Sequence, residues 1–353
     1  MSVAEKIPIE NIYYLLCYAW NKLEEREIVE VSGIDTTNIV NLFAKVLIGG
    51  LYHLLKRGVD RGYLLYSEDT NSLKGKICFN STLKRNLFIK VQAHCEYDEL
   101  NYNVLHNRII KSTLWQLICV DSVDGKLRDE LIGLHRRLRE VEEVTLSKTI
   151  FNRVQLHRNN YFYDFLLKIC ELVYDNLLVS EEPGKSKFRD FLRDERQMAF
   201  LFEEFIRNFY RIEAPQYLVS REDIYWDAVP LDALSAGFLP KMTTDISINS
   251  DIAKVIVEAK YYKEALDYHY DAQKIHAPHL YQLVSYLKNV EARGGVNQDC
   301  SGVILYPSVN KEINLSYMMS GHKVMIKTIN LNQPWELIHK NMISILESAM
   351  LNN

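Results

Sequence analysis

The chain has 353 residues, of which 48% are hydrophobic and 25% charged, and its formal net charge at pH 7 is −4. This length predicts two domains of ordinary size, and the composition excludes a disordered chain. The acidic balance argues against a protein that holds DNA by itself, because neutralising phosphate groups usually takes a basic surface.

The N-terminal half is predicted to be mainly helical, with a β-rich interruption. Residues 9–24 have apolar side chains all round, whereas residues 37–58 show an apolar repeat of helical period that ends at a glycine. Residues 63–97 carry turn signals between β-rich runs and are predicted to form strands. Helical spacing returns in residues 103–120, 126–144 and 158–179.

A polar stretch at residues 180–190 contains Pro183 and Gly184 and interrupts the helical pattern. The domain boundary is expected either there or before the preceding helix, near residue 155. We place it near residue 155, which predicts an α+β domain over residues 1–155 and a second domain over residues 156–353.

The second half alternates helical and strand patterns in the order αβββαβ followed by βα, which is typical of an α/β domain with strands of mixed direction. The helices are expected at residues 195–213, 279–290 and 334–350, and the strands at residues 217–227, 301–308, 322–331 and twice within 241–263. Residues 161–353 contain 20 basic and 26 acidic side chains, so this half is the acidic one. If it acts on nucleic acid, it needs a partner to hold the substrate.

Neither a membrane span nor a secretory signal is expected. No apolar run approaches the roughly 20 residues of a membrane helix, and the acidic N-terminus lacks a small-residue cleavage site. The six cysteines are scattered without a CxxC pair, which argues against a zinc ribbon or a disulfide framework and fits a reducing compartment. We therefore expect a cytoplasmic protein without membrane contact.

The stretch from Lys241 to Lys263 places polar side chains among Ile and Val. Side chains alternate between the faces of a strand, so Glu258 and Lys260 share a face and lie about 7 Å apart along it. Pairing of the two strands would bring Asp245 beside Glu258. These residues are either ordinary polar positions of a half-exposed sheet or a metal-binding edge, and burial of charges without a purpose would be costly.

Two convergent carboxylates suit Mg²⁺, or Mn²⁺ in its place, and a neighbouring lysine can orient water or contact a phosphate. Asp245, Glu258 and Lys260 match the PD-(D/E)xK nuclease pattern in a version without the proline. Gln282 and Tyr286 share a face of the following helix, a Gln-xxx-Tyr pattern similar to that of the RecB-like branch of these nucleases.

Further polar pairs have weaker functional interpretations. Glu203 and Glu204 lie on the first helix of the second half, where they either supply a metal ligand or belong to a solvated face. His276 and His279 have zinc-like spacing without a third ligand nearby, so a substrate-facing loop or helix N-terminus is the better interpretation.

Taken along its whole length, the chain resembles the McrC family, the nuclease subunits of McrBC-type modification-dependent restriction systems. The segments that carry the resemblance occur in the family's order: NIYYLLCYAW (11–20), SLKGKI (72–77), NRIIKSTL (107–114), DFLRDERQM (190–198), LPKMTTDISI (239–248), VEAKYYK (257–263) and HLYQLVSYL (279–287). The resemblance implies a PD-(D/E)xK endonuclease domain in which Asp245 and Glu258 bind the metal and Lys260 and Gln282 assist catalysis. It also implies that the backbone carbonyl of Ala259 completes the metal shell.

The resemblance further implies a partner: an McrB-like AAA+ GTPase hexamer that holds the double-stranded DNA and reads the modified base. The N-terminal half would insert a projection into the pore of this ring and stimulate GTP hydrolysis, and the nuclease domains can dimerise. No Walker A loop occurs in this chain, and Lys74-Gly75-Lys76 is too short to form one, so GTP is expected only on the partner. The alternatives are a non-catalytic, pore-inserting activator and a self-sufficient nuclease.

Overall fold

The computed structural model describes residues 7–23, 38–157, 160–179, 186–188, 192, 194–232, 235, 237–261, 266–269, 272–308 and 312–351. The chain forms two compact units. Unit 1 contains helix α1 (Ile9–Ala19) and every element from α8 (Glu195–Glu213) onward. Unit 2 runs from α2 (Ile39–Arg57) to β5 (Ser186–Phe188).

This division differs from the predicted boundary near residue 155 in two ways. Helix α7 (Tyr161–Asn176) packs against α4 (Leu105–Ile118) and therefore belongs to unit 2. Helix α1 packs against α8, far away in the sequence, because the ring of Tyr18 contacts those of Phe205, Phe209 and Trp335. Burying these aromatic surfaces joins the start of the chain to its second half.

Unit 1 is built around a six-stranded sheet with the strand order β14-β15-β13-β10-β9-β6. The three strands β10, β13 and β15 are parallel to their neighbours in this group, whereas β6, β9 and β14 are added antiparallel. This mixed sheet confirms the predicted α/β class. Its strands are β6 (Leu218–Ser220), β9 (Ile246–Asn249), β10 (Lys254–Ala259), β13 (Ser301–Ser308), β14 (Asn314–Met319) and β15 (His322–Asn330).

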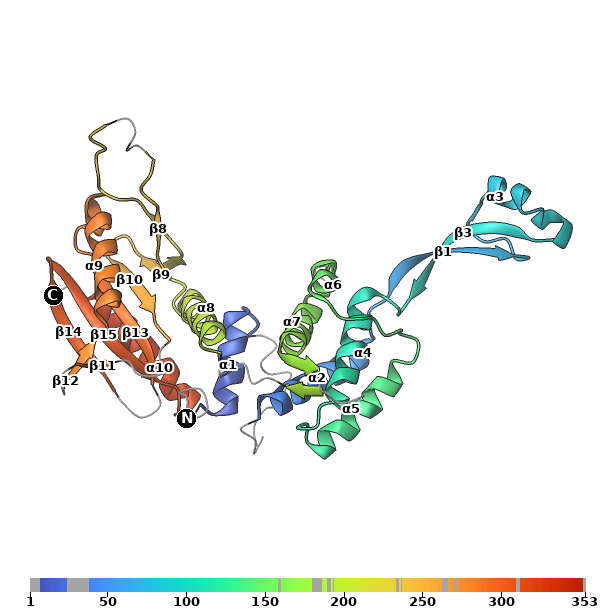
Figure 1. Cartoon of the computed structure of the whole chain (residues 1–353), viewed down its shortest axis with the longest axis horizontal. Coiled ribbons are helices and arrows are strands. Elements are labelled where there is room, and N and C mark those ends of the chain that lie inside the picture. Colours follow the sequence, from blue (N-terminus) through green and yellow to red (C-terminus); the bar gives the residue numbers. More distant parts are fainter. Residues whose placement is uncertain are drawn as a thin grey trace. The chain divides into compact units, whose positions relative to one another are not determined.

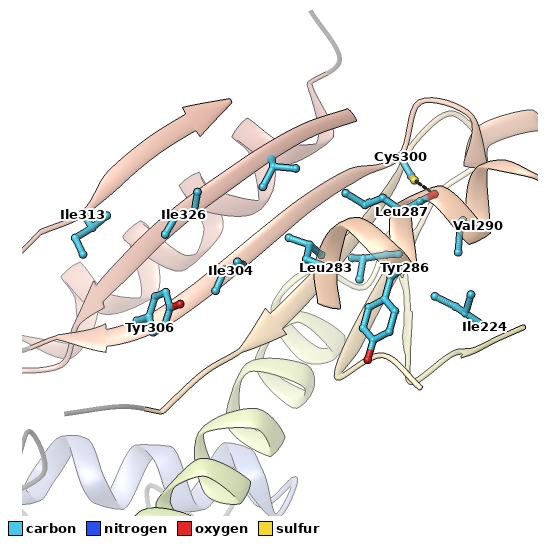
Figure 2. Packing of buried hydrophobic residues seen from close by; sticks show 12 residues of the cluster. Ile224, Leu283, Tyr286, Leu287, Val290, Cys300, Ile304, Tyr306, Ile313 and Ile326 are labelled. Carbon is cyan, nitrogen blue, oxygen red and sulfur yellow. Dashed lines mark hydrogen bonds between the residues drawn. The ribbon is translucent and has the colours of Figure 1, made fainter. Parts of the chain in front are cut away.

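Helix α9 (Ala277–Glu291) covers one face of this sheet. Its side chains Leu283 and Leu287 pack with Ile304 and Ile326 of the parallel strands, in a buried apolar cluster shown in Figure 2. Helices α8 and α10 (Trp335–Met350) pack on the central strands from the other side and are joined where Tyr210 Oη donates to the carbonyl of Met342. The central strands are therefore buried on both faces, as parallel strands usually are.

The sequence pattern did not predict β14 or one of the two small ribbons of unit 1, and it placed the strands of the other ribbon within longer strands at residues 217–227 and 241–263. β14 is an edge strand whose side chains are mostly exposed, so it lacks the apolar alternation by which strands are predicted. The ribbons pair β7 (Asp223–Ile224) with β8 (Met242–Thr243), and β11 (Leu266–His269) with β12 (Ala272–Ile275).

In unit 2, a group of helices carries a long β-ribbon. Strands β1 (Gly62–Thr70) and β3 (Ala93–Asn101) pair antiparallel along their whole length, and short β2 (Lys76–Ile77) joins β3. Figure 1 shows this ribbon extending away from the helices of unit 2, with α3 (Phe79–Lys84) at its far end. We call this segment, residues 62–101, the projection. The remaining elements are η3 (Leu87–Lys90), α5 (Gly125–Arg137), α6 (Lys148–Asn152), β4 (Leu177–Val179) and, in unit 1, η6 (Gly295–Asn297).

Specific contacts hold the base of the projection and the segment that leads into β2. At the base, the Asn107 amide donates to the carbonyls of Asp60 and Tyr102, which flank the two strands. Directly before β2, Gly75 has φ +55°, and an added Cβ would lie 2.5 Å from the carbonyl oxygen of Glu96, in the middle of β3. The Lys-Gly-Lys segment is therefore a tight turn packed on β3, where glycine is required.

Helix α2 is long and apolar enough to cross a membrane by length and composition alone, although no such run was expected from the sequence. Most of its surface is buried, and Phe43 and Leu47 are completely inaccessible to solvent. The core helix of a soluble domain has the same properties.

Candidate active site

Asp245 and Glu258 are brought together by the β9–β10 hairpin. The hairpin closes where the Ser250 amide donates to the Ala253 carbonyl, and its register places Ile246 opposite Val257. Asp245, one residue before β9, consequently lies opposite Glu258. The Asp245 peptide nitrogen is 3.5 Å from Glu258 Oε1, so the predicted juxtaposition of these two carboxylates is present.

Lys260 and the Ala259 peptide complete this cluster. Lys260 Nζ lies 2.9 Å from Glu258 Oε2 and 3.9 Å from Asp245 Oδ2. The Ala259 N–H donates to Asp245 Oδ2 over 3.0 Å, which fixes the rotamer of that carboxylate relative to β10. The Lys260 amide in turn donates to the Leu305 carbonyl of β13, so the neighbouring strand anchors the cluster.

Burial dominates the electrostatics of the cluster. The side chain of Glu258 is 0% exposed, and this burial, together with the nearby Asp245 charge, raises the pKa of Glu258 to about 8. Burial lowers the pKa of Lys260, but the Glu258 and Asp245 carboxylates outweigh it and keep that pKa above its usual range. Lys260 therefore remains an ammonium ion at neutral pH, suited to orienting or stabilising charge rather than to removing a proton.

The donor set fits a hard divalent cation. Glu258 Oε2 is buried and accepts no well-directed hydrogen bond, although Lys260 lies close to it. Within the described part of the chain, no three His, Cys, Asp or Glu side chains form a metal cluster. Two carboxylates suit Mg²⁺, which usually keeps several water ligands, better than zinc, and the contribution of the Ala259 carbonyl stays a prediction.

Gln282 and Tyr286 of α9 form a hydrogen-bonded chain toward the hairpin. Gln282 Nε2 lies 2.8 Å from Tyr286 Oη, and this hydroxyl donates to the Thr243 carbonyl over 3.1 Å. Burial raises the pKa of Tyr286, and the charges of Glu258 and Asp245 contribute to the rise. The chain thus links α9 to the segment that leads into Asp245.

Glu203 and Glu204, considered above as metal ligands, are engaged by arginines. Arg207 binds both glutamates from the next turn of α8, with 3.1 Å between Arg207 Nη1 and Glu203 Oε1, and Arg221 also contacts both. Arg207 Nη1 also lies 3.4 Å from the Asp245 carbonyl oxygen. The i+3 and i+4 spacing of Arg207 was a signal for this network, whereas no sequence pattern pointed to Arg221.

The two histidines belong to the packing at the start of α9. His279 is buried, and its Nδ1 lies 2.7 Å from Tyr306 Oη on β13. The His276 ring lies 5.0 Å from the His279 ring, centroid to centroid. Zinc binding by this pair therefore gains no support from its surroundings.

Comparisons with known proteins agree with this architecture. The model of the family described as McrBC 5-methylcytosine restriction system component matches residues 9–307. The Escherichia coli K12 protein described as type IV methyl-directed restriction enzyme EcoKMcrBC is 32% identical over 344 residues, which cover 98% of each chain. A solved half-complex of Thermococcus gammatolerans McrB AAA+ hexamers with bound McrC contains a chain of the same fold, with a TM-score of 0.63 and 18% identity over 97% of this chain and 76% of that one.

A mixed α/β sheet whose hairpin gathers two carboxylates and a lysine is typical of the nuclease class of restriction proteins. This chain belongs to the family of McrBC 5-methylcytosine restriction system components, because the family match covers most of its length and the E. coli relative is similar from end to end. The resemblance predicted from the sequence segments is confirmed.

Proposed function

We propose that this chain is the DNA-cleaving subunit of an McrBC-type complex, that it hydrolyses phosphodiester bonds with Mg²⁺, and that it stimulates an McrB-like AAA+ GTPase ring. The observation that carries the nuclease part is the convergence of Asp245, Glu258 and Lys260 around a completely buried carboxylate. The name of the E. coli relative, a restriction enzyme, supports the same activity.

The proposed mechanism assigns a separate task to each side chain. Asp245 and Glu258 would hold Mg²⁺, or Mn²⁺ in its place, with the Ala259 carbonyl as a further ligand. Bound there, the cation supplies Lewis-acid stabilisation of the charge that develops during phosphodiester hydrolysis. Lys260, kept protonated by the two carboxylates, would donate to a phosphate oxygen or orient the attacking water.

Gln282 and Tyr286 would act mainly as positioning residues. Their hydrogen bonds end on the Thr243 carbonyl, two residues before Asp245, and so restrict the backbone that carries the first carboxylate. Restricting a ligand in this way lowers the cost of arranging it for catalysis.

The projection of unit 2 supports the partner part of the proposal. It exposes apolar side chains at its far end, among them Phe79, Phe88, Ile89 and Val91, which is unfavourable unless a partner covers them. The solved chain of the same fold comes from a complex with AAA+ hexamers, and an acidic chain gains from a partner that holds DNA. GTP would bind only to that partner, in the prokaryotic cytoplasm.

The test uses the full chain assembled with its ring partner. Glu258→Gln and Lys260→Met should abolish cleavage of modified DNA and leave the stimulation of GTP hydrolysis unchanged, because they alter only unit 1. Glu291→Gln is the matched control, since Glu291 forms a similar carboxylate–lysine pair with Lys288 at the end of α9. Persisting cleavage in either active-site variant would refute the site. Absence of cleavage in the wild-type complex, with GTPase stimulation intact, would favour a non-catalytic activator.

A further inference from the structure

We propose that Arg221 contacts a phosphate of the DNA strand beside the active site, held in place for this purpose by Glu203 and Glu204. The inference rests on the proposed nuclease function and adds a substrate-binding residue to it. Arg221 lies in the turn between β6 and β7. Its ion pairs with Glu203 and Glu204 connect this turn to α8.

A continuous series of contacts connects Arg221 to the cluster. Arg221 Nη2 is paired with Glu203 Oε1 and lies 3.5 Å from Glu204 Oε1. The same Glu203 oxygen accepts from Arg207 Nη1 over 3.1 Å, and Arg207 Nη1 reaches the Asp245 carbonyl at 3.4 Å. Two side chains, Glu203 and Arg207, therefore connect Arg221 to the backbone of Asp245, one of the proposed metal ligands.

The side chains of Arg207 and Arg221 differ in solvent exposure, which indicates different tasks. The Arg207 side chain is 8% exposed and is enclosed by the glutamates, so its task is to support the backbone of Asp245. The Arg221 side chain is 45% exposed, and its ion pairs engage Nη2. A guanidinium has five N–H donors in a planar fork, so holding one edge on carboxylates leaves the other suited to a phosphate.

The distribution of charge around the site explains why an exposed arginine is useful at this position. Beside the cluster, Glu203 and Glu204 place two carboxylates, against which Arg207 sets a single buried cation. A phosphodiester that approaches this region would be repelled by the remaining negative charge. Arg221 supplies a more exposed positive charge at the same place, which reduces this repulsion and offers hydrogen bonds to the incoming strand.

The competing explanation is that Arg221 only anchors the β6–β7 turn to α8. Arg293 provides a comparison for this role, because it binds Glu222 over 2.5 Å with a side chain that is 35% exposed. Glu222 also pairs with Lys254, the first residue of β10, which lies about 13 Å along the strand from Glu258. Arg293 is thus a similar surface arginine that anchors the same turn without adjoining the active-site cluster.

The experiment measures DNA binding and cleavage by the complete complex at several salt concentrations. Binding is measured on the cleavage-deficient Glu258→Gln background, so that it does not depend on turnover. Adding Arg221→Gln should weaken binding roughly tenfold, as expected for one lost charge-assisted contact. It should also reduce the slope of log Kd against log salt by about one, because one phosphate contact is lost.

Cleavage with Glu258 intact provides the second readout. Arg221→Gln should raise the KM for DNA more than it lowers kcat, and Arg221→Lys should recover part of the loss because it keeps the charge without the planar fork. Arg293→Gln should behave like wild type in every measurement. An unchanged salt slope in Arg221→Gln, or an equal defect in Arg293→Gln, would mean that Arg221 only anchors its turn to α8 and does not contact DNA. A failure of the proposed function would look different: the wild-type complex would not cleave, or Glu258→Gln would.

Discussion

Lys260 and Glu258 meet as an ion pair 2.9 Å long at a carboxylate that solvent does not reach. A single ammonium does not balance this site, because Asp245 adds a second carboxylate 3.9 Å from the same nitrogen. Burial of Glu258, together with the charge of Asp245, raises the pKa of Glu258 to about 8. A divalent cation would offset this negative charge.

This relationship predicts how stability depends on pH. Without a divalent cation, the folded chain keeps the Glu258 proton up to a pH of about 8, whereas the unfolded chain loses it near 4.5. The retained proton therefore stabilises the folded chain fully below about pH 4.5, and this stabilisation is lost as the pH rises toward about 8. By the linkage relation, the loss in the free energy of unfolding is on the order of a few kcal/mol. Glu258→Gln lacks this titration, so its melting temperature in a chelator should rise relative to that of wild type between pH 5 and pH 8.5.

The same melting experiment in the presence of Mg²⁺ tests whether the two carboxylates bind the metal. Magnesium should raise the melting temperature of wild type more at pH 8.5 than at pH 6, because binding requires ionised carboxylates. It should have little effect on Glu258→Gln. A difference between wild type and variant that stays constant with pH would contradict the raised pKa.

Gln282 and Tyr286 should act as one unit. Tyr286→Phe removes the hydrogen bond to the Thr243 carbonyl and should cost about 1 kcal/mol of stability, with slower cleavage. Gln282→Ala should slow cleavage by a similar factor through the same chain of contacts. In the double variant the two effects should be less than additive, as measured by a double-mutant cycle of cleavage rates. Fully additive effects would instead mean that Gln282 assists catalysis independently of Tyr286.

Two glycines of unit 2 should respond in opposite directions to the same substitution. Gly75→Ala forces a side chain into a positive φ and against the Glu96 carbonyl, and should destabilise unit 2 by about 1–3 kcal/mol. Gly133→Ala, inside helix α5 with no atom within 4 Å of the added Cβ, should stabilise by about 0.5–1 kcal/mol. Thermal unfolding measures both effects.

The consequence for the partner follows from the location of Gly75 in the projection. Gly75→Ala should reduce stimulation of the ring GTPase and leave Mg²⁺ binding by unit 1 unchanged, whereas Gly133→Ala should affect neither. Full stimulation by a folded but locally distorted Gly75→Ala protein would show that the turn is not used for contact with the ring.

The sequence predicted those parts of unit 1 whose burial leaves a continuous apolar run or a helical repeat. Strand β13 was placed at residues 301–308, and the alternation in β10 put Glu258 and Lys260 on one side, because these strands lie inside the apolar core. The edge strand β14 was missed because exposure removes the pattern. Arg221 was missed because its partners are distant in the sequence and only the fold brings them together.

The place of α1 could have been read more fully than it was. Residues 9–24 are apolar on all sides, which already indicates a helix that is enclosed by other elements rather than one lying on a surface. What the sequence could not specify was which elements enclose it. That choice depends on the fit of Tyr18 among Phe205, Phe209 and Trp335, contacts that span most of the chain.

Because α1 packs with α8 and α10, the whole of unit 2 is, in terms of chain order, an insertion within unit 1. A fragment that begins at residue 156 would carry every candidate catalytic residue and still expose the apolar groove from which α1 had been removed. The reverse operation disturbs the fold less. The end of α1 lies beside Asn208, so a flexible linker that reaches from there back to the start of α8 would delete the projection and retain the complete fold around Glu258. Evolution can exchange such an inserted module without disturbing its host, so the part that addresses the ring and the part that cuts need not have changed at the same pace.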